Sequence, residues 1–317
     1  MKSRESGLPF DDFRALLNNL PPVEEDALNL VRSQCAERLG DRESKFGELC
    51  TWYAGWSGRS PVITRPILTL FAGTHLVDTS FDAWLLDQIS EISSGTSAIN
   101  RICHQHDLGL KVLDLALQIP VNDITREAAL DEKACAGTIA FGMEAIAGSV
   151  DLLCSAAIET APTLSSLAIL CVLSGVDQKA LIGGVSAEQA TAITAAVAMV
   201  QSCQDNPLEV LRRLGGRETA AICGAILAAR SQHIPVIVAG PTALASMAIL
   251  HAVEPQSVSH CLMAQRTGSE ALDLIVRDMG VQFAMDDFVT AVPAVQLALA
   301  AGLVKSASLA LVSANQA

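Results

Sequence analysis

Short apolar runs alternate with longer amphipathic segments along most of the chain. The apolar runs lack the strict alternation of a strand with one exposed face, and strands buried on both faces look like this. Five runs have this character: 66–73, 110–117, 149–157, 234–240 and 258–264. The segments between them carry apolar residues at helical spacing, at 81–106, 131–146, 163–174, 187–203, 207–213, 217–231 and 242–252. This alternation predicts an α/β fold, a doubly wound and mostly parallel sheet with helices on both faces.

Both ends of the chain are predicted to be helical and to lie outside the sheet. The early helical patterns begin with acidic residues, and 57–61, Ser-Gly-Arg-Ser-Pro, has the composition of a linker. The last pattern, 286–307, predicts one more helix. We therefore expect N-terminal helices of a small domain over 1–60, a Rossmann-like α/β domain over 61–288, and a C-terminal helix over 289–317 that packs on the small domain.

Composition and charge exclude several kinds of partner. Half of the 317 residues are hydrophobic and the formal net charge is −13, which disfavours nucleic acid and anionic membranes because phosphate binding needs clustered Lys and Arg. Mean hydropathy is high, at +0.38. However, the most apolar window, 164–176, falls short of the roughly 20 residues of a membrane-spanning helix. Residues 1–13 lack the apolar core of a signal peptide. We expect a soluble cytoplasmic protein.

Neither a metal nor a bound cofactor is predicted. The nine cysteines form no CxxC pair, and buried reduced thiols explain most of them. Residues 103–106, Cys-His-Gln-His, have closely spaced ligand types, but a helix would turn the two histidines to different faces. The chain also contains no GxGxxG, Walker A, GxSxG or HExxH motif.

Three turns carry candidate chemistry, each with a structural alternative. His75 follows the first predicted strand, where it could bind a ligand, transfer a proton or cap a helix. Ser94 and Gly95 lie in a hydroxyl-rich turn that could approach a phosphate or serve helix contact. Gly240 and Thr242 open a helix directly after a strand, so the positive end of the helix dipole favours an anion. The proline between them removes one donor, and Thr242 could simply be an N-cap.

Residues 205–229 resemble the segment DPLEVLxxLGGxEIAALxGAILxAA of the nicotinate-nucleotide:dimethylbenzimidazole phosphoribosyltransferases. These enzymes attach the lower base during cobalamin assembly. Further stretches are similar to family segments in the same order along the chain, so the resemblance covers most of it. They are 46–58, 70–77, 93–100, 150–153 and 233–252.

The resemblance implies a reaction and a set of binding residues. In the family, a base or phenol displaces nicotinate from nicotinate mononucleotide, a glutamate serves as general base, and the site is shared across a dimer. Glycine-rich turns and backbone N–H groups hold the phosphate. By this resemblance, the pair Gly215-Gly216 is expected to bind substrate. The pair Gly183-Gly184 stands where the phosphate-holding GRGTG motif should be, but without its Arg or Thr.

The chain departs from the family where the chemistry is expected. The family motif GEMGIGNTT has no match in 154–164. Ala157 takes the position of the glutamate of this motif, and Glu159 lies two residues further on. The segment with the C-terminal general base has no counterpart, and the nearest carboxylates there are Asp286 and Asp287. Glu159 and Asp286 are therefore the candidate catalytic residues.

These departures leave three hypotheses about function. The first is a subunit with an incomplete site that pairs with a catalytic paralogue. A two-subunit relative that attaches phenol or p-cresol has this arrangement. The second is an active homodimeric phosphoribosyltransferase with a rearranged site that uses Glu159 or Asp286. The third is a non-enzymatic nucleotide-binding or scaffold protein. The first two require nicotinate mononucleotide and an aromatic base or phenol as partners.

Overall fold

A parallel sheet forms the centre of the molecule, as the sequence predicts. The computed structural model describes residues 9–38, 44–77, 82–159 and 163–311. These residues form a six-stranded sheet with the order β2-β1-β3-β4-β5-β6, in which all neighbouring strands are parallel. The strands are β1 (Pro66–Ala72), β2 (Gly109–Asp114), β3 (Leu152–Ala157), β4 (Val236–Val238), β5 (Cys261–Gln265) and β6 (Gln282–Met285). The doubly wound α/β prediction is confirmed.

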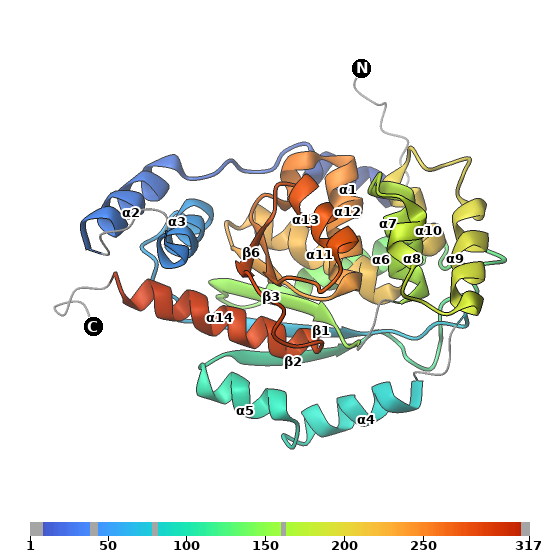
Figure 1. Ribbon diagram of the computed structural model, residues 1–317, viewed down its shortest axis with the longest axis horizontal. Helices are drawn as coiled ribbons and strands as arrows, with labels where there is room; N and C mark the ends of the chain where they lie inside the picture. Colours follow the sequence, from blue (N-terminus) through green and yellow to red (C-terminus); the bar gives the residue numbers. More distant parts are fainter. Residues whose placement is uncertain (1–8, 39–43, 78–81, 160–162, 312–317) are drawn as a thin grey trace.

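Each face of the sheet is covered by helices (Figure 1). One face packs against α6 (Glu132–Gly142), α7 (Leu164–Leu173), α10 (Pro207–Leu214), α11 (Arg217–Ser231) and α12 (Pro241–Val253), with α8 (Gln178–Ile182), α9 (Ala187–Met199) and α13 (Glu270–Asp278) outside them. The other face packs against α3 (Lys45–Ser57), α5 (Ala98–Gln105) and α14 (Pro293–Leu309). The helix α4 (Asp82–Ser93) precedes α5.

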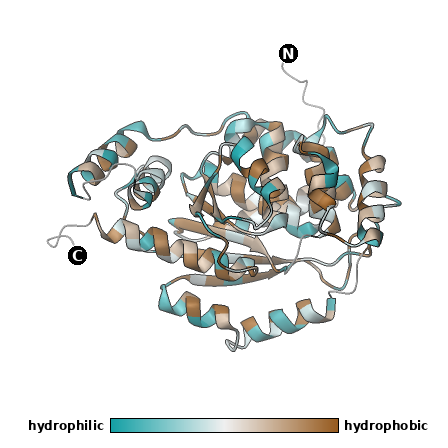
Figure 2. Cartoon of the chain, viewed as in Figure 1, coloured by the Kyte–Doolittle hydropathy of each residue, from teal (hydrophilic) through white to brown (hydrophobic). Residues whose placement is uncertain are grey.

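Strand side chains alternate between the two hydrophobic clusters. In β1, Phe71 belongs to the first cluster, whereas Leu68 and Leu70 belong to the second. This follows from the period of two in a strand. Because both faces are covered, most neighbouring positions are apolar, and the strands are mostly brown in Figure 2.

The two ends of the chain meet on one side of the molecule. The helix α2 (Glu25–Arg38) packs on α3, and α14 also packs on α3. However, α14 also lies across the second face of the sheet, in the same hydrophobic cluster as its strands. The first helix, α1 (Pro9–Leu17), contributes instead to the cluster on the opposite face. The proposed boundaries at residues 60 and 288 stay a prediction.

Several elements differ from the sequence prediction. The single helix expected over 81–106 is divided into α4 and α5 by a turn in which Gly95 has φ of +76°. The strand β6 and the helix α13 were not predicted from the hydrophobic pattern, and β6 has only four residues. The last helix begins at Pro293 rather than at 286, because proline fits the first position of a helix.

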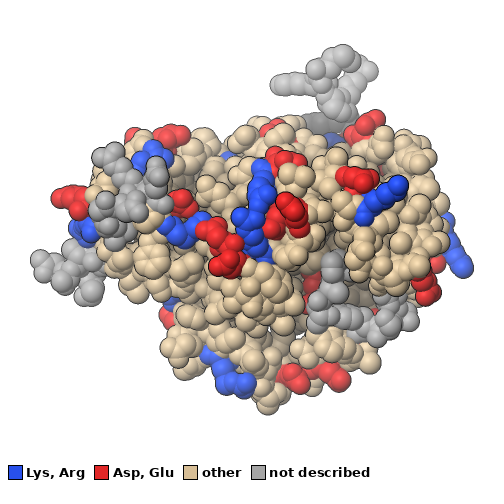
Figure 3. Space-filling model, in the orientation of Figure 1, with Lys and Arg blue, Asp and Glu red and all other residues tan. Residues whose placement is uncertain are grey.

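The described surface has no extended basic area on the face shown in Figure 3, where Lys and Arg lie in separate groups among Asp and Glu. In the described ranges, no helix is both long and apolar enough to cross a bilayer.

Glycines allow α6 and α11 to pack closely. A Cβ on Gly224 of α11 would collide with the backbone carbonyl of Ile139, and a Cβ on Gly142 of α6 would collide with that of Ala221. Gly224→Ala is therefore expected to lower the free energy of unfolding by about 1–3 kcal/mol, the usual cost of overpacking. In contrast, Gly137→Ala on the exposed side of α6 meets no atom within 4 Å, and we expect it to raise stability by about 0.5–1 kcal/mol. Urea denaturation of both variants tests this close contact. Equal changes in the free energy of unfolding for the two substitutions would contradict it.

Candidate active site

A cavity of about 230 Å³ opens at the carboxyl ends of β1 and β3. From β1 the chain continues to β2 on one side, and from β3 it continues to β4 on the other, so the loops after these strands diverge. Ligands of doubly wound proteins bind in such a crevice. The described lining residues are Phe71, Gly73, Thr74, His75, Val77, Asp82, Leu85, Ala157, Ile158, Glu159, Thr163, Leu164, Ser165, Gln189, Glu218 and Thr242.

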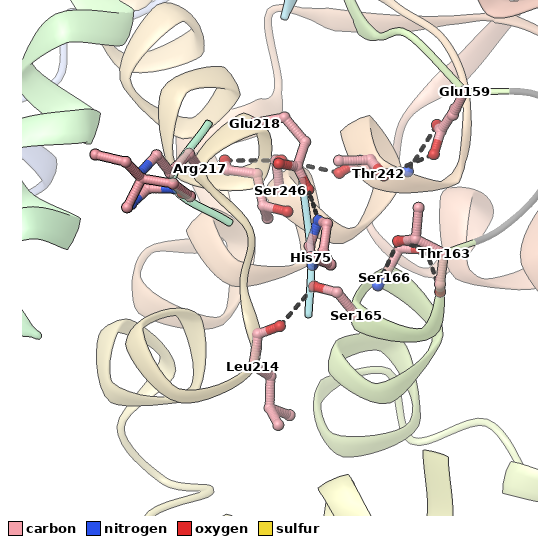
Figure 4. A network of polar contacts seen from close by, with 12 residues as sticks. His75, Glu159, Thr163, Ser165, Ser166, Leu214, Arg217, Glu218, Thr242 and Ser246 are labelled. Atoms are coloured by element: carbon pink, nitrogen blue, oxygen red, sulfur yellow. Dashed lines mark hydrogen bonds and ion pairs between the residues drawn. The ribbon is translucent and has the colours of Figure 1, made fainter. Parts of the chain in front are cut away.

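Glu159 occupies the N-terminus of α12. The backbone N–H of Thr242 donates to Glu159 Oε1 at 3.1 Å, and the Thr242 hydroxyl donates to Oε2 at 2.7 Å (Figure 4). Gly240, with φ of +85°, makes room for this carboxylate, because a Cβ there would collide with Oε1. The sequence predicts an anion at this helix end, and the structure places a carboxylate of the chain itself there.

Burial raises the pKa of Glu159 to about 8. The residue is only 3% exposed. Both hydrogen bonds from Thr242 favour the carboxylate and lower the pKa, Glu218 raises it, and His75 lowers it, but burial is the largest of these effects. A carboxyl group with a pKa near the working pH can both accept and release a proton.

The raised pKa of Glu159 predicts a pH-dependent stability. In the unfolded chain this carboxyl loses its proton near pH 4.5, whereas in the folded protein it keeps it to about pH 8. Stability is therefore expected to fall as pH rises across this window, by at most about 1.4 kcal/mol per pH unit. Glu159→Gln should remove this slope, and the exposed Glu188→Gln should not. Denaturant unfolding at pH 5, 6.5 and 8 measures the slope of the free energy of unfolding against pH. A slope in Glu159→Gln equal to that of the parent protein would contradict the prediction.

A buried ion pair lies beside Glu159. His75 Nε2 is 2.8 Å from Glu218 Oε1, which joins the end of β1 to the first turn of α11. Two glycines provide the space, since a Cβ on Gly73 or on Gly216 would collide with the Glu218 carboxylate. The second oxygen of Glu218, Oε2, is buried and has no hydrogen-bond partner among the described residues.

The pKa of Glu218 is lowered in spite of complete burial. Burial by itself would raise it, but the charge and the hydrogen bond of His75, the backbone N–H of Glu218 and the charge of Arg217 outweigh that effect. Glu218 is therefore the ionised carboxylate of the cavity at neutral pH, whereas Glu159 is mostly protonated there. Two neighbouring carboxyl groups with pKa values displaced in opposite directions are typical of acid–base sites.

The start of α7 forms another wall of the cavity. Thr163 is its N-cap, with Oγ1 accepting from the Ser166 N–H at 3.0 Å, and the Ser165 hydroxyl donates to the Leu214 carbonyl at 2.5 Å. The first N–H groups of a helix have no partner within it and can bind an anion. The ionisable side chains of the cavity are nevertheless Asp82, Glu159, Glu218 and His75, and the described lining includes no Lys or Arg.

Comparison with known proteins gives the family of the chain. The model of the phosphoribosyltransferase family matches residues 20–314. A protein of Sinorhizobium sp, named nicotinate-nucleotide–dimethylbenzimidazole phosphoribosyltransferase, is 42% identical over 317 residues, which cover 96% of this chain and 94% of that protein. The chain belongs to the phosphoribosyltransferase family.

A second relative and a solved structure are also similar to the chain. A protein of the same name from Brucella anthropi is 43% identical over 319 residues, again covering 96% of this chain and 94% of the relative. The crystal structure of nicotinate-nucleotide-dimethylbenzimidazole phosphoribosyltransferase from Thermus thermophilus superposes with a TM-score of 0.75, at 19% identity, over 97% of each chain. This last similarity shows the fold.

Within this phosphoribosyltransferase fold, the structure brings together part of the predicted site. Glu159, His75 and Thr242 line the cavity, and Gly240 and Gly216 lie against its carboxylates. Gly215, beside Gly216, packs on Leu211.

The other predicted residues do not line this cavity. Ser94 and Gly95 lie on the exposed turn between α4 and α5, and Gly183 and Gly184 lie on the exposed turn after α8. The side chain of Asp286 is 65% exposed and pairs with Lys45 at 3.3 Å.

Sequence reasoning missed Glu218. Its signal is an acidic residue two positions after the paired glycines, in the first turn of a helix that is otherwise almost wholly buried. No group of three or more His, Cys, Asp or Glu side chains within the described ranges could hold a metal ion. Residues 160–162, next to Glu159, lie outside the described residues.

Proposed function

We propose that the chain takes part in phosphoribosyl transfer from nicotinate mononucleotide to an aromatic base or phenol, which gives the lower-ligand riboside phosphate of cobamides. The relatives that are 42% and 43% identical carry the name of this reaction with dimethylbenzimidazole. The cavity at the carboxyl edge of the sheet is the position that the fold favours for its substrates.

Glu159 is the proposed proton acceptor. In the reaction the bond between the ribose C1 and the pyridine nitrogen breaks, and nicotinate leaves with the electron pair. A ring nitrogen or phenolic oxygen of the acceptor forms the new bond to the same carbon, and its proton passes to the Glu159 carboxylate. Phe71, Val77 and Leu85 provide apolar surface for the aromatic ring.

The cavity has few groups that could bind the phosphate of nicotinate mononucleotide. Asp82 and Glu218 would repel a phosphate dianion at neutral pH, and His75 is already paired with Glu218. Among the other described lining residues, helix N–H and hydroxyl groups could attract the phosphate. This charge distribution is the observation that carries the finer proposal: the chain is a subunit with an incomplete site, and a catalytic paralogue of the same fold supplies the phosphate contacts.

An active homodimer is the second candidate. It is favoured by one observation, the position of Glu159 in the cavity with a pKa of about 8. Asp286 suits the role of base less well, because its exposed carboxylate pairs with Lys45 outside the cavity.

Calorimetric titration of the lone chain separates these candidates. The proposed subunit is expected to bind dimethylbenzimidazole or phenol and to bind nicotinate mononucleotide at least tenfold more weakly than its complex with the paralogue does. Tight binding of nicotinate mononucleotide by the lone chain would favour the homodimer. Absence of binding for all three compounds, alone and in the complex, would contradict both and leave a scaffold role.

A further inference from the structure

A second cavity lies at the opposite, amino-terminal edge of the sheet. Its volume is about 260 Å³, and it is enclosed by the end of α3, the segment before β1, the turn before β3 and the residues after α11. In Figure 1 this edge of the sheet is the one that the segment from α3 enters. The lining residues are mostly polar: Tyr53, Ser57, Arg59, Arg65, Gly148, Ser149, Val150, Asp151, Gln232, His233 and Ile234.

The hydroxyl of Tyr53 is buried in this cavity wall without a partner. The side chain is 0% exposed, and its Oη lies near the Ser57 hydroxyl but forms no well-aligned hydrogen bond among the described residues. The neighbouring Ser57 hydroxyl accepts from the Arg59 N–H at 3.2 Å. A buried hydroxyl without a good partner lowers the stability of the fold, and this cost is understandable where the group serves a ligand.

Two arginines beside Tyr53 are available for an anion. Arg59 and Arg65 are exposed, and neither guanidinium forms an ion pair or a hydrogen bond within the described part of the chain. Arg59 lies in the linker 57–61, and Arg65 is the residue directly before β1. A lining with two such cations is unusual in a chain of net charge −13.

Two other ionisable groups of the lining, Asp151 and His233, already have partners. The Asp151 carboxylate accepts from the Thr64 N–H at 2.6 Å, from the Thr64 hydroxyl at 2.9 Å and from the Arg65 N–H at 2.9 Å. His233 Nδ1 lies 3.4 Å from Glu24 Oε1. The groups left to bind a ligand are therefore the two guanidinium groups, the Tyr53 hydroxyl and the Gln232 amide.

We propose that this cavity binds a phosphate group, either free or as a small phosphomonoester. Guanidinium groups match phosphate oxygens in geometry and charge, and a phosphate has enough acceptor oxygens to engage the tyrosine hydroxyl as well. The volume is below the roughly 300 Å³ at which pockets for drug-sized ligands begin, which favours a small ligand. This site lies on the opposite edge of the sheet from Glu159 and does not depend on the proposed function.

Calorimetric titration with inorganic phosphate and with ribose 5-phosphate, at constant ionic strength, tests the proposal. Both probes are expected to bind the full chain. Tyr53→Phe should weaken binding at least tenfold, since a hydrogen bond to a charged group is lost, while the melting temperature stays unchanged or rises. Arg59→Gln/Arg65→Gln should abolish binding, and Glu159→Gln should leave it unchanged.

The two probes also identify the source of the phosphate. Tighter binding of ribose 5-phosphate indicates a monoester, and equal binding indicates free phosphate. Absence of binding by both probes, or affinities that survive Tyr53→Phe and the double arginine variant, would overturn the proposal.

Discussion

His75→Ala is expected to lower the free energy of unfolding by about 3–5 kcal/mol, because it leaves the buried carboxylate of Glu218 without its partner. The loss should depend on pH. In the parent protein the pKa of Glu218 is lowered, so the ion pair contributes stability above pH 4.5 that is lost as the pH falls through the folded pKa. Denaturant unfolding at pH 4 and pH 8 should therefore show a smaller effect of His75→Ala at pH 4.

A double variant separates the charge from the lost packing. His75→Ala/Glu218→Gln removes both charges, and we expect it to be more stable at pH 8 than His75→Ala alone. Equal losses for the single variant at both pH values, or a double variant that is no more stable than the single one, would show that the contact of His75 with Glu218 is not electrostatic in origin.

Glu159→Gln is expected to reduce turnover by the chain, assayed with the proposed catalytic paralogue, by about 10²–10⁴-fold, the usual contribution of a general base. The amide keeps the size of the side chain and can still accept from the Thr242 N–H, but it cannot take a proton. The parent rate should rise with pH up to about 8, the pKa of Glu159, and level off above it. A steady-state assay between pH 6 and 9 measures both effects.

Asp286→Asn is the matched control for this prediction, because Asp286 is the other carboxylate suggested by the sequence and lies outside the cavity. We expect its turnover to stay within about threefold of the parent. Loss of activity in Asp286→Asn with retention in Glu159→Gln would assign the base to the other residue.

The fold was predictable because its signals are local. Strands such as 66–72 are buried on both faces and therefore read as continuous apolar runs, and helices such as 217–231 have clear ends. The strand β6 was not predicted because four residues are too few to show a hydrophobic pattern. The division between α4 and α5 depends on the left-handed backbone of Gly95.

The site was predictable only in part because it depends on contacts between distant residues. His75, Glu159 and Thr242 follow strand ends, which is a local signal. The contact of Glu159 with Thr242 spans 83 positions, and that of His75 with Glu218 spans 143, so neither follows from a motif. Glu218 could have been suspected as a carboxylate in a buried helix.

The proposal of an incomplete site is tested most directly by the rate of phosphoribosyl transfer of the purified chain, alone and mixed with the proposed catalytic paralogue. Nicotinate mononucleotide and dimethylbenzimidazole or phenol serve as substrates, and release of nicotinate is followed. We expect little or no turnover by the lone chain and a large increase on mixing, because the described lining of its cavity has no Lys or Arg for the phosphate. Turnover by the lone chain at the rate of the pair would contradict it.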